Sequence, residues 1–143
     1  MEMKIKELEQ ALAEQIAGLE TSQIPTAPVE YEEVSFDWTE PDNARWLEII
    51  RRQLASAASF EIYCWNEETE WIDLALKYGS IKNDGWQYGK KIAGSVTKEF
   101  SEMLLSLPKP TDIEYENKMT PFFNIFLDDT FQSCHYGTEV FFR

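Results

Sequence analysis

The chain has 143 residues, 43% of them hydrophobic and 14% aromatic, and its 26 acidic against 13 basic side chains give a net charge of −13. This length predicts one domain with a real core, and the aromatic content excludes a disordered chain despite the acidity. Direct binding to nucleic acid or to an anionic membrane is disfavoured, because both depend on clustered Lys and Arg.

The first twenty residues carry an amphipathic pattern. Apolar side chains recur at three- and four-residue steps, at Ile5, Leu8, Leu12, Ile16 and Leu19. This stripe predicts a helix over residues 1–20 that packs on the body of the protein or pairs with a second copy as a homodimer. Residues 21–29 contain two prolines and predict a linker, so that residues 30–143 form a single domain.

No apolar run approaches the roughly 18 to 20 residues that a membrane span requires. The N-terminal pattern is charged and lacks the apolar region of a signal peptide. We therefore expect a cytoplasmic protein without contact to a membrane, in which Cys64 and Cys134 are reduced and structural.

The stretch EYEEVSFDWTEPD, residues 30–42, is acidic and contains no base. Its carboxylates are Glu30, Glu32, Glu33, Asp37, Glu40 and Asp42. Acids without a neighbouring base, beside an aromatic anchor such as Trp38, are suited to binding a cationic protein surface. The alternative interpretation is that these acids only keep the protein soluble. The stretch is therefore a candidate for partner binding.

Two regular elements are predicted next. Thr39 is expected as the N-cap of a helix, with Glu40 and Asp42 in its first turn, where the helix dipole favours negative charge. One face of this helix carries Trp46, Leu47, Ile50 and Leu54. The stretch SFEIYCW, residues 59–65, alternates in polarity and predicts a strand.

The stretch WNEETEW, residues 65–71, sets acids between two tryptophans. Asn66 predicts an N-cap, and Glu67, Glu68 and Glu70 then fall in the first turn of a helix that ends at Gly79. The three acids remain candidates for partner binding, but a helix start already explains them. We therefore expect Glu30, Glu32, Glu33 and Asp37 to contribute more to binding.

The remaining chain is rich in strands. The glycine-containing stretch after Gly79 predicts a hairpin or an irregular loop, and Thr97 to Leu107 predicts a helix that the sequence PKP stops. PFFNIFL and TFQSCHYG predict a hairpin around Asp128 and Asp129, and TEVFF a last strand. The whole predicts an α+β domain with helices packed on an antiparallel sheet.

The sequence contains only weak indications of a catalytic or metal-binding site. Asp112, Glu116 and Lys118 resemble part of a metal-dependent nuclease site, but no basic groove accompanies them to hold a polyanion. His135 is the single histidine, and as a strand neighbour of Cys134 it would face the opposite way. We predict no catalytic activity and no bound metal or cofactor.

In character the chain resembles the immunity proteins of bacterial contact-dependent growth inhibition and related polymorphic toxin systems. The shared character is a small, acidic, Trp- and Tyr-rich α+β protein, visible here in EYEEVSFDWTEPD, CWNEETEW and the aromatic C-terminal strands. The resemblance implies binding to a cognate basic toxin domain, often a nuclease, whose active site is covered. Two alternatives stay open: a nucleic-acid mimic that blocks a DNA-binding protein, and a small metal-dependent enzyme using Asp112, Glu116 and Lys118.

Overall fold

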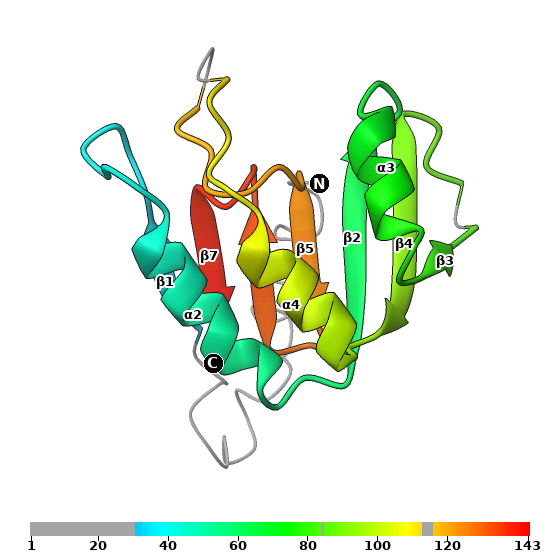
Figure 1. Ribbon diagram of the computed structural model, residues 1–143, viewed down its shortest axis with the longest axis horizontal. Helices are drawn as coiled ribbons and strands as arrows, with labels where there is room; N and C mark the ends of the chain where they lie inside the picture. Colours follow the sequence, from blue (N-terminus) through cyan, green and yellow to red (C-terminus); the bar gives the residue numbers. More distant parts are fainter. Residues whose placement is uncertain (1–30, 84, 113–115) are drawn as a thin grey trace, which may run out of the picture.

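The computed structural model describes residues 31–83, 85–112 and 116–143 of the chain. The predicted helix over residues 1–20, the predicted linker over residues 21–29 and the candidate Glu30 lie outside these described residues. The described chain forms a single antiparallel sheet of seven strands with three helices packed on it (Figure 1). The predicted α+β class is therefore confirmed.

The strands are β1 (Glu32–Ser35), β2 (Ser59–Trp65), β3 (Ser80–Ile81), β4 (Gly89–Ser95), β5 (Asn124–Leu127), β6 (Phe131–Cys134) and β7 (Glu139–Phe142). The helices are α2 (Ala44–Leu54), α3 (Thr69–Ala75) and α4 (Lys98–Ser106). The strand order is β1-β7-β6-β5-β2-β4-β3. Because β2 pairs with both β4 and β5, it joins the C-terminal strands to the first half of the chain.

The main core lies between the sheet and the helices, which all cover one face of the sheet (Figure 1). Phe60 of β2 stacks on Phe100 of α4 with ring centroids 3.9 Å apart. Trp46 of α2 is buried, and its indole Nε1 donates to Oγ of Ser133 on β6 at 3.1 Å. The apolar sides of α2 and α4 thus fix both helices against the central strands.

Several predicted elements are confirmed. The predicted strand at residues 59–65 has the bounds of β2, and Thr97 caps α4 by accepting the backbone N–H of Phe100 at 3.1 Å. Asp128 and Asp129 form the turn between β5 and β6, and β7 is the predicted last strand. The stretch after Gly79 forms the β3–β4 hairpin.

The predicted start of α2 at Thr39 is wrong. The helix begins after Asn43, and its first turn contains no acid. Asp37 Oδ1 accepts the backbone N–H of Thr39 at 2.8 Å, and Asp42 Oδ1 accepts that of Ala44 at 3.0 Å. These short-range hydrogen bonds hold the backbone in turns, so the helix starts further along the sequence than predicted.

The predicted start of α3 at Asn66 is also wrong, because the helix begins only after Glu68. Of the three acids assigned to its first turn, only Glu70 lies there. Glu68 Oε1 instead accepts the backbone N–H of Trp65 at 2.8 Å, which closes a turn before the helix. The dipole explanation therefore holds for Glu70 and fails for Glu67 and Glu68.

Strand β1 was not predicted. Two consecutive acids, Glu32 and Glu33, interrupt the polarity alternation that marks a half-buried strand. The strand forms because β7 pairs with it, placing Val34 opposite Val140. Partly buried Val34 packs on the core, and Phe36 is buried in it.

Candidate functional site

Three loops that are distant in the sequence lie at one end of the sheet, where β1 and β2 end (Figure 1). They are residues 36–43 before α2, residues 66–68 before α3, and the described parts of residues 107–123 before β5. With the β6–β7 turn, residues 135–138, they form what we call the acidic end. The acids of these loops and of the first turn of α3 are Asp37, Glu40, Asp42, Glu67, Glu68, Glu70, Asp112 and Glu116.

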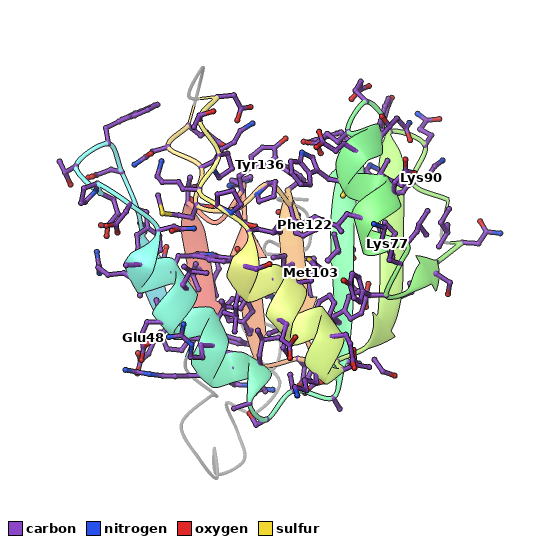
Figure 2. The ribbon with its side chains drawn as sticks, in the orientation of Figure 1. Glu48, Lys77, Lys90, Met103, Phe122 and Tyr136 are labelled. Carbon is purple, nitrogen blue, oxygen red and sulfur yellow. The ribbon has the colours of Figure 1, made fainter. Side chains whose placement is uncertain are left out.

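Tyr136 connects two of these loops from the β6–β7 turn (Figure 2). Its O–H donates to Glu68 Oε2 at 2.8 Å, and the Lys118 ammonium lies 4.1 Å from its ring centroid. Its backbone carbonyl accepts the N–H of Met119 at 2.8 Å. His135 and Tyr136 have φ values of 52° and 60°, a left-handed backbone that costs energy in non-glycine residues and persists where the surroundings fix it.

Asn117 connects the loop before α2 to the segment before β5. Its side chain is buried, and Nδ2 donates to the carbonyls of Asp37 and Glu40 at 2.8 and 3.0 Å. Its Oδ1 accepts a hydrogen bond from the Lys109 ammonium. A buried amide that uses both its donor group and its acceptor fixes the spacing of the two loops.

A groove of about 340 Å³ opens between the start of α3 and the segment before β5. Its charged lining consists of Glu67, Glu68, Glu70, Asp112 and Lys118. Four carboxylates against one ammonium make the groove anionic. The structure therefore brings the acids of WNEETEW together with Asp112, which lies more than forty residues further along the chain.

Lys118, the one cation among the described residues that line the groove, is already engaged. Lys118 Nζ lies 2.7 Å from Asp112 Oδ2, and this hydrogen bond lowers the pKa of Asp112. Burial raises the pKa of the nearby Glu116 carboxyl. Within the described part of the chain, Glu67 and Glu70 form no ion pair, so their charges face solvent and remain available to an external cation.

The loop before α2 presents a second group of acids beside an exposed aromatic ring. Trp38 is 58% exposed, and Asp37 and Asp42 are exposed on either side of it. The Glu40 side chain is only 12% exposed and pairs with Arg45 at 2.8 Å. Glu40 is therefore neutralised internally, whereas Asp37, Trp38 and Asp42 remain accessible.

Glu32 and Glu33 are exposed but lie outside the acidic end. They sit on β1, the edge strand of the sheet, opposite Phe142 and Phe141 of β7. Successive strand residues point to opposite faces, so the two carboxylates do not share one surface. Charged residues on an edge strand also discourage pairing with other chains.

Among the residues considered for catalysis, Cys134 ends β6 and His135 follows it, whereas Asp112 and Glu116 lie in the segment before β5. Over residues 31–83, 85–112 and 116–143, no three His, Cys, Asp or Glu side chains gather so as to hold a metal ion. His135 follows β6, and its Nδ1 lies 2.9 Å from Glu139 Oε2. Burial raises the pKa of the Cys134 thiol to about 12, so this side chain carries no thiolate at neutral pH.

Sequence reasoning did not identify Tyr136 and Asn117 as residues of the site. Their partners Glu68 and Asp37 lie 68 and 80 residues away. A hydrogen bond over such a separation leaves no local pattern of residue types, so no sequence signal pointed to either residue.

The chain matches no protein-family model, no curated protein and no solved structure. In the portion that the structure describes, no helix has both the length and the apolar character needed to cross a membrane.

Proposed function

We propose that this protein is a non-enzymatic, cytoplasmic inhibitor that binds a cognate basic toxin domain, such as a nuclease, and occludes its active site. The observation that supports this most is the convergence at the acidic end of carboxylates from three separate loops. Lys109 and Lys118 are the cations that these loops contribute among the described residues, and both are engaged internally.

The chemistry of such a partner explains the arrangement. A nuclease concentrates Lys and Arg around the position of its phosphate substrate, and a surface of opposite charge steers it into an encounter. The bonds of Asn117 and Tyr136 hold the loops in place before binding, so less ordering is needed when the partner arrives. Exposed Trp38 offers the aromatic anchor that such interfaces use.

The metal-dependent enzyme receives no support from the site. The Lys118 ammonium binds the Asp112 carboxylate, which is one of the two acids that such an enzyme would need as a metal ligand. The acidic groove would also repel a polyanionic substrate.

The experiment co-expresses this chain with the product of the neighbouring gene, which the proposal expects to contain the toxin domain. We expect co-expression to protect a bacterial host from that domain, and the Glu67→Lys, Glu70→Lys double variant to lose protection. The matched control is Glu99→Lys, Glu102→Lys on α4, which has the same spacing and the same change in charge. Glu99 lies in the first turn of α4 as Glu70 does in α3, so both double variants lose one helix-start acid.

Two results contradict the proposal. If no toxin domain is neutralised and a DNA-binding protein is inhibited instead, the protein is a nucleic-acid mimic. If both double variants protect as well as the wild type, the acidic end is not the binding surface.

A further inference from the structure

The sheet has a second face, opposite the three helices (Figure 1). Successive side chains of a strand point to opposite faces, so the residues that alternate with core residues on the central strands point to this one. On β2, β5 and β6 the buried ones are Tyr63, Asn124, Phe126, Gln132 and Cys134, and the partly exposed Glu61 and Trp65 of β2 point the same way. The register places Tyr63 beside Asn124 and Phe126 beside Gln132, so the five form one patch, which we call the second face.

The second face is buried although none of the described helices covers it. Tyr63 is 3%, Phe126 4% and Gln132 7% exposed. Tyr63, Phe126 and Cys134 are buried apolar residues that do not belong to the core cluster between sheet and helices. A bare sheet surface would leave the central Phe126 open to water, so this face requires a cover that the described helices do not provide.

The loop before β4 supplies part of this cover. Trp86 contacts Tyr63 with ring centroids 5.9 Å apart, and Trp65 at 5.3 Å. These contacts lie at the β2–β4 side of the second face. Phe126 and Gln132 lie further along the sheet, on β5 and β6, so Trp86 does not account for their burial.

Two amides of the second face each have an atom that lacks a hydrogen-bond partner. They are Oε1 of Gln132 and Nδ2 of Asn124, and both side chains are buried. An unpaired buried polar atom is unfavourable, so a cover that brings polar groups beside its apolar surface fits this face better than a wholly apolar one.

We propose that residues 1–20 form a helix that packs in cis on the second face through the stripe Ile5, Leu8, Leu12, Ile16 and Leu19. This segment is the occupant because residues 21–30 join it to β1, which lies in the same sheet, and its stripe supplies the apolar surface that this face needs. At about 100° per residue, Glu9 and Gln15 flank the stripe and bring polar groups toward Asn124 and Gln132.

The dimensions agree with this packing. A helix of residues 2–20 is about 28 Å long at 1.5 Å per residue, and seven strands about 4.8 Å apart span about 29 Å. Tyr31, where the described chain begins, is anchored by its O–H to the carbonyl of Asp129 at 3.0 Å. The ten residues from 21 to 30 reach at most about 33 Å, which is enough to carry the helix across the face.

Point variants of the full chain test the proposal. Leu12→Asp places a charge in the stripe, and Gln10→Asp places the same charge on the opposite side of the helix as a matched control. We expect a wild-type monomer by light scattering, and for Leu12→Asp stronger binding of the dye ANS with a Tm lower by several degrees. Gln10→Asp should match the wild type in both.

Two outcomes overturn the proposal. One is a Leu12→Asp variant that matches the wild type in dye binding and Tm. The other is a wild-type dimer whose mass is halved in Leu12→Asp, which would show that the helix pairs between copies.

A second measurement covers the case in which Leu12→Asp does not fold. The apolar photo-crosslinker p-benzoylphenylalanine replaces Leu12, so the stripe stays apolar and the chain keeps its length. On irradiation we expect crosslinks within the monomer to peptides from residues 123–134. Crosslinks between two chains, or to peptides of α2 or α4 in place of the sheet, would contradict packing on the second face.

Discussion

The phenolic O–H of Tyr136 donates to Glu68 Oε2 at 2.8 Å, and the other carboxylate oxygen of Glu68 accepts the backbone N–H of Trp65 at 2.8 Å. One carboxylate therefore fixes the turn before α3 against the β6–β7 turn. Burial, and then the hydrogen bond to Glu68, raise the pKa of Tyr136 above its usual value. The phenol thus remains a neutral donor throughout the physiological pH range.

Tyr136→Phe should lower the free energy of unfolding by about 1 to 2 kcal/mol, because it removes a hydrogen bond to a charged, partly exposed acceptor. The matched control is Tyr31→Phe, which removes a bond to the exposed carbonyl of Asp129 and should cost about 0.5 kcal/mol. Urea denaturation measures both variants. Equal costs would mean that the bond to Glu68 does not stabilise the acidic end more than an ordinary surface bond.

Thr97→Ala should cost about 1 kcal/mol of stability, because Thr97 Oγ1 accepts the N–H of Phe100 at the start of α4. The comparison is Thr39→Ala, at the residue that the sequence indicated as the cap of α2. Thr39 caps no helix and only donates its hydroxyl to Asp37, so the loss there should be smaller. Thermal unfolding of both variants measures the two losses of stability. A larger loss for Thr39→Ala than for Thr97→Ala would contradict the observed start of α2.

The stability conferred by Asp128 should depend on pH. Hydrogen bonds from the backbone N–H groups of Ala58 and then Ser59 hold the pKa of Asp128 below its ordinary value of 3.8. A lowered folded-state pKa means that the stabilisation is complete above pH 3.8 and is lost as the pH falls through the lower folded value.

Asp128→Asn tests this dependence while tolerating the φ of 49° at this position. At neutral pH it should be less stable than the wild type by about 0.5 to 1 kcal/mol, since the site is exposed. The difference should shrink in urea titrations below pH 3.8. Asp129→Asn serves as control, because its solvent-exposed pair with Arg143 contributes little. A difference that stays constant with pH would refute the assignment.

Both cysteines should be unreactive in the folded protein. Burial raises the pKa of Cys64 and of Cys134 to about 12. The thiols are therefore neutral in the folded state at pH 8, and the stability that this provides is lost only as the pH rises above the ordinary value of 9.0. Ellman's reagent should react with two thiols rapidly in denaturant and slowly without it. Rapid reaction of either thiol in the native protein would contradict its burial.

Charge-reversal variants should show whether the acidic end or the edge strand β1 contributes more to partner binding. From the sequence we expected Glu32 and Glu33 to contribute more to binding, because a helix start explained Glu67 and Glu68. The structure places both of these acids before the first turn of α3, so that reason no longer applies. Given the proposed function, Glu67→Lys with Glu70→Lys should slow association with a basic toxin domain more than Glu32→Lys with Glu33→Lys. It should also flatten the salt dependence more strongly. Stopped-flow measurements over a range of salt concentrations test this, and the opposite order would place the interface on β1.

Local patterns determined much of the fold from the sequence alone. The alternation of residues 59–65 and the helical pattern of residues 97–107 involve neighbours within a few positions, and β2 and α4 formed where these patterns predicted them. The same holds for the hairpin of β5 and β6, whose turn residues stand beside the strands that they join. The α+β class follows from such local signals, because periodicity and capping act over one or two turns of chain.

Only the tertiary structure decided where the acids lie. Strand β1 exists because β7 pairs with it, and α2 and α3 start late because carboxylates of the preceding loops bind nearby backbone N–H groups. The acidic groove combines WNEETEW with Asp112, and the bonds of Asn117 and Tyr136 fix the loops around it. The contacts of β1, Asn117 and Tyr136 join residues that are far apart in the sequence, so they form only in the packed protein. The hydrogen bonds before α2 and α3 compete with an earlier helix start that the local residue types favour equally well. Charge could therefore be counted from the sequence, but its distribution over the surface could not.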